Sequence, residues 1–145
     1  MNPTSSLLLL ALWLPAADPK EDAKKDLEKM QGTWKVEKLV REGMEVPGEI
    51  RDKLSVVIAK NRMTVQIQGQ AGEDAEIVLD PSAKPAQMDF TPTNPKDNKP
   101  RKGIYKFDGD TLYLCWTRGG GDRPKDFESK PQSMTVLFEL KKEKK

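Results

Sequence analysis

The chain has 145 residues, of which 33% are charged, and this length suits a single modest domain. Its 25 lysines and arginines nearly balance its 23 aspartates and glutamates, and a net charge of +2 is too small for the bulk field to attract nucleic acid or anionic lipid. The chain contains no histidine, which excludes catalysis by a histidine base and removes the commonest ligand of zinc and copper. We therefore expect a protein that is not an enzyme, holds no metal or other cofactor and has no nucleic-acid partner.

The N-terminus has the features of a secretory signal peptide. Residues 7–14 form an apolar run, which is much shorter than the roughly 20 residues that span a bilayer as a helix. The small residues Ala16 and Ala17 precede a charged stretch that opens at Asp18. We expect cleavage after residue 17, which leaves residues 18–145 as one domain in the periplasm, at the cell surface or outside the cell, with no stable membrane insertion. An uncleaved membrane anchor and a wrongly assigned start codon are the alternatives.

The rest of the sequence predicts one helix followed by strands. Ala23, Leu27 and Met30 recur at spacings of four and three, which indicates a short helix over 20–31 that Gly32 ends. From Trp34 onward, apolar residues alternate with polar ones, as a sheet with one dry and one wet face requires. The alternation predicts strands over 33–41, 54–59, 62–68, 74–79, 86–91, 103–107, 111–117 and 134–140.

Turn sequences separate most of these strands. Lys60-Asn61 and residues 69–72 are expected to close two hairpins, and Asp108-Gly109 predicts a type I′ turn, in which both central residues have positive φ. The connections over 92–102 and 118–133 are longer. Eight sequential strands joined mostly by hairpins predict an all-β, antiparallel up-and-down barrel after the helix, because closure removes the exposed sheet edges. An open sheet folded as a sandwich is the alternative.

Several segments resemble a known family. The sequence LEKMQGTW over 27–34 resembles the opening of lipocalin-type barrels, in which a helix leads into Gly-x-Trp on the first strand. Together with KGIY at 102–105, DGDTL at 108–112, LC at 114–115, and RP at 123–124 before Phe127, it closely resembles small exported lipocalin-like domains expanded in planctomycete bacteria. This resemblance covers about residues 26–140 and implies a lipocalin-like barrel in an exported protein. It implies no particular activity, because none is established for that family.

The sequence departs from lipocalins at the end of the last strand. Lipocalins typically place an arginine from this strand over the tryptophan of the first strand. Here the last strand runs into Lys141 and Lys142. The stem of a lysine can cover an indole ring, but a lysine lacks the planar fork that lets arginine stack and donate hydrogen bonds together.

Four residues are interpreted as structural. Trp34 is expected to fill the closed end of the barrel, Gly32 to end the helix and Gly109 to form a hairpin turn. Cys115 lies on the opposite face of its strand from Trp116, and it is the only cysteine of the chain. Without a histidine or a second thiol, it is predicted to be a small buried residue, and an intermolecular disulfide is the alternative.

Positive charge gathers around the two long connections. The cations concerned are Lys96, Lys99, Arg101, Lys102, Lys106, Arg118 and Arg123. We predict that Lys99, Arg101, Lys102 and Arg123 surround a barrel mouth that binds an anionic ligand, with Trp116 at the end of its strand lining the entrance. An ordinary solvated face is the alternative, and no aromatic residue is interleaved with these cations for base stacking.

These features favour an exported binding module for an unidentified small or anionic ligand at one barrel mouth. The alternative is a barrel filled with its own side chains, whose loops bind another envelope protein or a polymer. An eight-stranded barrel is either just filled by side chains or able to hold one small ligand. A cavity of ~300 Å³ or more with a few convergent polar groups would favour the first function.

Overall fold

The computed structural model describes residues 19–93, 99–118 and 121–143. The predicted signal peptide and its cleavage site, together with Lys96, lie outside the described residues. None of the helices in the described part of the chain is long and apolar enough to cross a membrane.

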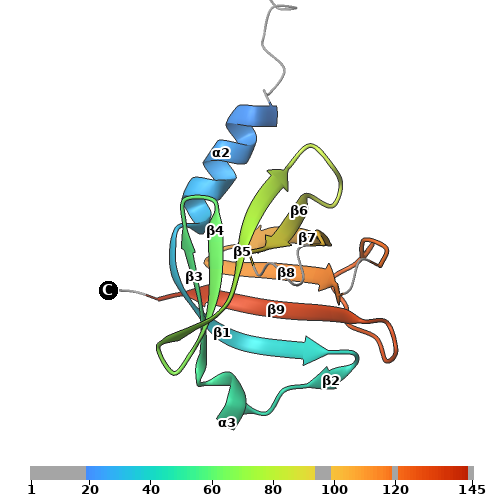
Figure 1. The fold of residues 1–145 in the computed structure, drawn as a ribbon. Helices are drawn as coiled ribbons and strands as arrows, with labels where there is room; N and C mark the ends of the chain where they lie inside the picture. The colour runs from blue at the N-terminus through green and yellow to red at the C-terminus, as the bar shows by residue number, and fades with distance from the viewer. Residues whose placement is uncertain (1–18, 94–98, 119–120, 144–145) are drawn as a thin grey trace, which may run out of the picture.

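The described chain forms a short helix followed by a strongly curved antiparallel sheet (Figure 1). The elements are α2 (Pro19–Met30), β1 (Gly32–Arg41), β2 (Met44–Glu45), α3 (Gly48–Arg51), β3 (Leu54–Ala59), β4 (Arg62–Ile67), β5 (Gln70–Asp80), β6 (Gln87–Pro92), β7 (Arg101–Asp108), β8 (Thr111–Thr117) and β9 (Thr135–Lys142). The strands and the helix agree closely with the ranges predicted from hydrophobic periodicity.

The sheet closes into a barrel because β1 pairs with both β3 and β9. The closing register places Trp34 opposite Lys142 and Leu39 opposite Phe138. Every other neighbouring pair along the sheet is also antiparallel and sequential, so β1 and β3 to β9 form an eight-stranded up-and-down barrel. The predicted fold class is confirmed, and the alternative of an open sandwich is wrong because both edge strands are paired.

The barrel interior holds the main core. Along β8, for example, Leu112 and Leu114 are fully buried and Trp116 is 7% exposed, because alternate side chains point inward. The inward residues of the other strands and Met30 of α2 complete this core: Trp34, Val36, Leu39, Val56, Ile58, Met63, Ile77, Met88, Phe90, Tyr105, Val136, Phe138 and Leu140. Helix α2 covers one end of the barrel (Figure 1), which we call the closed end.

Two short elements were not predicted. Strand β2 has two residues and α3 has four, so neither is long enough to show a hydrophobic period. Strand β5 begins four residues earlier than predicted, because Gln68 and Gly69 form the hairpin turn and Ile67 pairs with Gln70.

The turn types also differ from the prediction. In the Asp108–Thr111 hairpin only Gly109 has positive φ, at 61°. This is the pattern of a type II′ turn rather than the predicted type I′ turn. The type I′ pattern occurs instead at Gln68-Gly69, where φ is 53° and 79°.

A second, smaller core lies outside the barrel. Ile104, Cys115 and Leu137 point outward from β7, β8 and β9 and pack together, and Phe127 covers them from the connection between β8 and β9. This part of the outer face is therefore dry, which explains why alternation in these strands is weaker than in β1.

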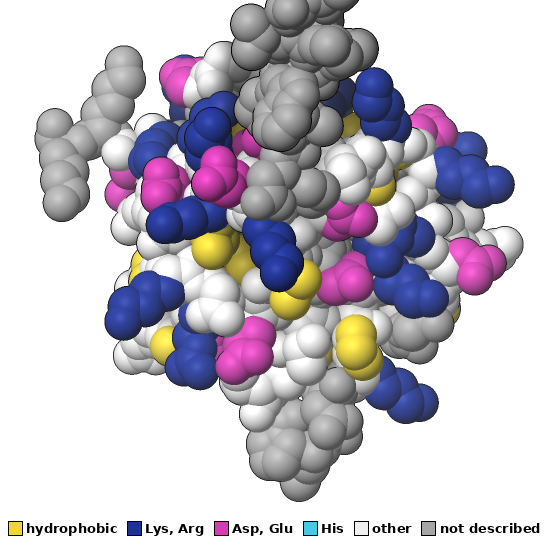
Figure 2. All heavy atoms as spheres, turned by 90° about the horizontal axis from the view of Figure 1, so that it is seen from above, with side chains coloured by type: hydrophobic (Ala, Val, Ile, Leu, Met, Phe, Trp, Pro, Cys, Tyr) yellow, Lys and Arg dark blue, Asp and Glu magenta, His cyan; other side chains and the backbone are white. Residues whose placement is uncertain are grey.

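The closed end has a mixed polar surface. Seen from the side of α2, lysines and arginines are interspersed with aspartates and glutamates, and only scattered hydrophobic side chains are visible (Figure 2). Among the residues coloured in this view, no large apolar or single-sign patch marks a binding surface.

Candidate functional site

The opposite end of the barrel, which we call the open end, contains two adjoining cavities. The first has a volume of about 290 Å³ and the second about 310 Å³. Val65, Glu73, Arg101 and Trp116 line both of them. The two cavities therefore form one divided site, with these four side chains between its halves.

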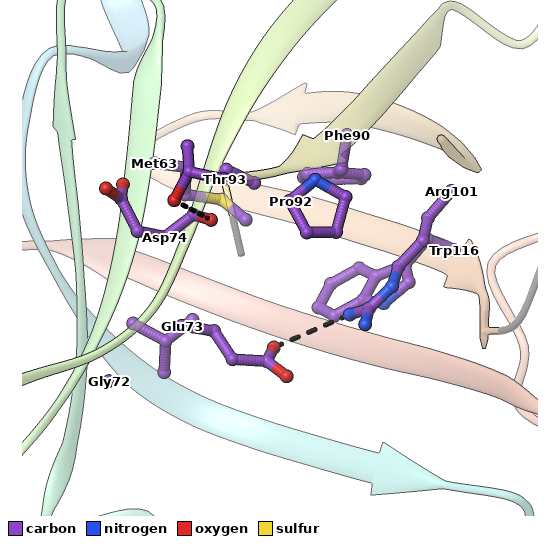
Figure 3. A pocket seen from close by; sticks show the side chains of 11 residues that line it. Met63, Gly72, Glu73, Asp74, Phe90, Pro92, Thr93, Arg101 and Trp116 are labelled. Atoms are coloured by element: carbon purple, nitrogen blue, oxygen red, sulfur yellow. Dashed lines mark hydrogen bonds and ion pairs between the residues drawn. The ribbon is translucent and has the colours of Figure 1, made fainter. Parts of the chain in front are cut away.

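The walls of the site are mainly apolar. The other residues of the first cavity are Met63, Gly72, Asp74, Ala75, Phe90, Pro92 and Thr93. The other residues of the second cavity are Leu39, Arg41, Leu54, Ile67, Arg118, Val136 and Phe138. Figure 3 shows several of the first group directed toward the space in front of Trp116.

Stacked aromatic rings form the wall nearest the barrel core. The centroids of Trp116 and Phe138 lie 5.0 Å apart with an interplanar angle of 15°, and Phe90 lies 5.1 Å from Trp116 at 50°. Aromatic pairs at this spacing are stabilised by about 0.5–1.5 kcal/mol beyond the burial of their area. They give the site an apolar surface against which a flat or aliphatic group can pack.

Gly103 makes room for this tryptophan. It pairs with Trp116 across β7 and β8. A Cβ atom at position 103 would lie 2.9 Å from the carbonyl oxygen of Cys115, 3.0 Å from that of Met88 and 3.0 Å from Cβ of Trp116. Two of these contacts are with backbone, which moves at high cost, so glycine is required for the two strands to bring Trp116 to its position.

An ion pair spans the opening. Nη1 of Arg101 lies 3.5 Å from Oε2 of Glu73, and Figure 3 shows the two side chains reaching toward each other in front of Trp116. The Arg101 side chain is 19% exposed, whereas that of Glu73 is 74% exposed. The arginine is thus held in the wall, and the glutamate reaches it from solvent.

Asp74, the other carboxylate among the described residues of the first cavity, is bound to residues of β4. Its Oδ1 accepts a hydrogen bond of 3.1 Å from Oγ1 of Thr64, and its Oδ2 lies 3.5 Å from Nη1 of Arg62. Its charge is therefore partly balanced by β4.

The described side chains that line the second cavity have an excess of positive charge. Arg41, Arg101 and Arg118 line it, and Glu73 is the only acidic residue among those described side chains. Arg118 also lies 3.8 Å from Glu42, in a pair that is nearly half exposed on both sides. This half of the site combines apolar walls with guanidinium groups.

The structure brings together two of the five residues predicted to form a binding rim. Arg101 and Trp116 line both cavities. Lys102 follows Arg101 in β7 and therefore points to the outer face, where it pairs with Asp89 in register. Lys99 is exposed and does not line either cavity.

Arg123 lies on the outer face, away from the site. Its Nη1 donates hydrogen bonds of 2.7 Å to Oδ1 of Asp89 and 2.8 Å to the carbonyl oxygen of Gly103. It ties the connection between β8 and β9 to the outside of β6 and β7. The prediction grouped it with Arg101 because two loops close in sequence to the same strands were expected to meet at one rim.

Sequence patterns missed most of the site. Glu73 precedes the predicted start of its strand, and Arg41 ends a strand that was considered only for its apolar face. Their roles depend on the register between β4 and β5 and on barrel closure. Glu73 has one such signal, because it lies two residues before the inward residue Ala75. Arg41 has none, because the bulge after Val36 shifts the phase that Trp34 and Val36 set.

The four residues interpreted as structural lie elsewhere. Trp34 is 2% exposed and its Nε1 donates a hydrogen bond of 2.8 Å to the carbonyl oxygen of Met30, while Gly32 links α2 to β1 with φ of 119°. Gly109 turns the hairpin between β7 and β8. Cys115 is fully buried, and this burial raises the pKa of its thiol to about 11.

The described residues offer little for covalent or metal chemistry. No group of three or more cysteine, aspartate or glutamate side chains within 19–93, 99–118 and 121–143 is arranged to hold a metal ion. A thiol with a raised pKa and no solvent access is a poor nucleophile. What the open end can do is enclose a small molecule between apolar walls and guanidinium groups.

Comparisons of the chain with protein-family models, with curated proteins and with solved structures find no match. The structure thus supports an eight-stranded closed barrel and assigns no family.

Proposed function

We propose that this protein is a binding module that holds a small, largely apolar ligand at the open end of its barrel. The observation that carries the proposal is the pair of adjoining cavities of about 290 and 310 Å³ that share Trp116 and Arg101. Each is near the lower limit of ordinary ligand pockets, which are mostly apolar with a few placed polar groups.

The filling of the barrel limits the size of the ligand. Trp34, Met30 and Leu112 are buried in the core, which α2 covers at the closed end. A ligand would therefore rest on the Trp116 and Phe138 rings instead of threading the whole barrel. This supports a small molecule, or one end of a longer one, as the occupant.

We also propose that the protein is exported after removal of residues 1–17 and that it acts without catalysis. The sequence of the leader supports export. The absence of histidine from the chain and the burial of Cys115 are consistent with a binding role.

Binding of the uncharged fluorophore phenylnaphthylamine tests the function. We expect its fluorescence to rise on addition of the folded protein and octanol to displace it. Val65→Phe places a larger side chain where both cavities meet and should weaken binding by about tenfold, because it fills apolar space that the ligand needs. Val78→Phe is the matched control, since Val78 is 67% exposed on the outer face of β5.

The two variants give clear outcomes. A loss of binding in Val65→Phe but not in Val78→Phe, with both proteins folded by circular dichroism, supports a ligand at the open end. No binding to the wild type, or equal binding by both variants, would overturn the proposal.

A module that binds another envelope protein or a polymer is the second candidate. Met44 is 75% exposed and Ile67 is 52% exposed, and both lie at ends of strands that line or border the second cavity. Large exposed apolar side chains near one rim are typical of contact surfaces. If the fluorophore does not bind, this candidate becomes the better supported one.

A further inference from the structure

We infer that Glu73 is a built-in competitor for Arg101, and that the open end selects an amphipathic ligand whose anionic group replaces Glu73 at that arginine. This inference rests on the proposed function and names its ligand class: a small molecule with an apolar body and one carboxylate, sulfonate or phosphate group.

The geometry of the ion pair makes it easy to displace. A strong bond between a guanidinium and a carboxylate has a donor–acceptor distance of about 2.7–2.9 Å. The Arg101–Glu73 distance is 3.5 Å, and the Glu73 side chain is 74% exposed. Glu73 can therefore return to water at little cost, since exposed pairs of this kind contribute little to stability.

Arg101 is positioned to hold an incoming anion. Its side chain is only 19% exposed, and it follows the inward phase of β7, pairing with Phe90 in register. A planar guanidinium presents a fork of donors that matches the two oxygens of a carboxylate. An anion at this place would adjoin the Trp116 ring, against which the apolar body of the same ligand can pack.

The charges around the second cavity favour an anion once Glu73 has moved. Arg41 and Arg118 line this cavity together with Arg101. The low-dielectric wall formed by Phe138, Val136 and Leu39 strengthens the attraction between these guanidinium groups and an anion inside. An uncharged ligand of the same shape gains nothing from the three arginines.

Two fluorophores with the same ring system but different charge distinguish the effect of ligand charge on binding from the effect of ligand shape. Anilinonaphthalene sulfonate carries one negative charge, and phenylnaphthylamine is its uncharged counterpart. Affinities of both are measured for the folded wild type and for each variant, and displacement by octanoate and by octanol provides a second matched pair. Thermal unfolding of each variant confirms that it is folded at the temperature of the titration.

Substitutions of Arg101 and of Glu73 should have opposite effects on sulfonate binding. Arg101→Gln should weaken sulfonate binding by about tenfold because it removes the fork of donors, and Arg101→Lys should restore part of that loss. Glu73→Gln should strengthen sulfonate binding by about threefold, because the competing carboxylate is gone. Because both residues line the cavities, the readout is the ratio of sulfonate affinity to phenylnaphthylamine affinity, which should fall in Arg101→Gln and rise in Glu73→Gln.

Two neighbouring residues provide controls for net charge. Lys102→Gln removes one positive charge, as Arg101→Gln does, but from the outer face of β7. Glu76→Gln removes one negative charge, as Glu73→Gln does, but from the exposed side of β5. We expect each to change sulfonate binding by less than about twofold, because both side chains are exposed on the outer face of the sheet and do not line the cavities.

Each result decides one question. If phenylnaphthylamine does not bind the wild type, the proposed function fails. If it binds but Glu73→Gln leaves sulfonate affinity unchanged, or raises the affinity for both fluorophores equally, the competitor role of Glu73 is overturned and the binding module remains. Equal losses in Arg101→Gln and Lys102→Gln would overturn the role of Arg101.

Discussion

Lys142 in the last strand places its ammonium group over the indole ring of Trp34 in the first strand. Nζ of Lys142 lies 5.5 Å from the ring centroid and donates a hydrogen bond of 3.3 Å to the carbonyl oxygen of Lys29 at the end of α2. The two residues are also opposite each other in the register that closes the barrel. One lysine thus connects the helix, the first strand and the last strand.

Loss of this lysine should weaken barrel closure. We expect Lys142→Ala to lower the free energy of unfolding by about 1 kcal/mol, because it removes both the cation over the ring and the stem that covers it. Urea unfolding followed by tryptophan fluorescence measures the change. Lys141→Ala is the control, since Lys141 is half exposed and its pair with Asp110 is 4.0 Å long; an equal loss there would contradict a special role for Lys142.

Tyr105 attaches α2 to the barrel. Its hydroxyl donates a hydrogen bond of 2.6 Å to Oδ2 of Asp26, although the two residues are far apart in sequence. We expect Tyr105→Phe to lower the free energy of unfolding by about 1 to 2 kcal/mol near pH 8, because a partly buried hydrogen bond to a carboxyl group is lost. Urea titration measures the loss, and no loss would show that the bond contributes nothing.

The same tyrosine should make stability depend on alkaline pH. Burial, followed by the hydrogen bond to Asp26, holds the pKa of Tyr105 well above its ordinary value. Above about pH 10 the unfolded chain releases the tyrosine proton while the folded protein keeps it, so stability falls as pH rises. The advantage of the wild type over Tyr105→Phe should therefore shrink between pH 9 and 11, and parallel curves for the two proteins would refute this linkage.

Cys115 should react slowly in the folded protein. It is fully buried, its Sγ lies 3.7 Å from the carbonyl oxygen of Glu128, and its pKa is raised to about 11. We expect an aromatic disulfide reagent at pH 8 to label it at least about a hundredfold faster in urea than in buffer, because labelling requires opening of its cover. Phe127→Ala should speed labelling in buffer, whereas rapid labelling of the wild type would argue against burial.

Arg123 should matter for stability and not for ligand binding. Arg123→Gln removes hydrogen bonds to Asp89 and to the carbonyl oxygen of Gly103. We expect it to lower the free energy of unfolding by about 1 to 2 kcal/mol with phenylnaphthylamine affinity unchanged. Lys130→Gln in the same connection is the control, because its pair with Glu128 is exposed on both sides. Weaker fluorophore binding in Arg123→Gln would indicate that Arg123 contributes to the binding site.

The strands were predictable because each depends mainly on its own residues. In β8, the apolar residues Leu112, Leu114 and Trp116 recur with period two, and this pattern holds whatever lies beside the strand. The hairpin after Phe107 was also predictable, although its turn type was not. The sequence Asp108-Gly109 fits the central pair of a type I′ turn, but Asp108 pairs with Thr111, so Gly109 and Asp110 are the central residues and only Gly109 has positive φ.

The site was less predictable because its residues come from separate strands. Arg101 and Trp116 were both expected at a mouth, and the structure places both there. Lys102 and Arg123 were expected beside them because they are close to these residues in sequence, but closeness in sequence does not fix the face of the sheet on which a side chain lies. The alternation of side chains along β7 puts Arg101 inside and its neighbour outside, and the hydrogen bonds of Arg123 hold it on the outer face.

The sequence by itself therefore determined the helix, the eight barrel strands and the inward phase of those with clear alternation, since hydrophobic period is a local property. In β1 the bulge after Val36 shifts this phase, and the apolar run over 54–59 does not show one. Only the tertiary structure decided which charges share a cavity. The meeting of Glu73 in β5 with Arg101 in β7 depends on the registers of both strands with β6, which lies between them. A shift of one residue in either register would turn one of the two side chains to the other face of the sheet.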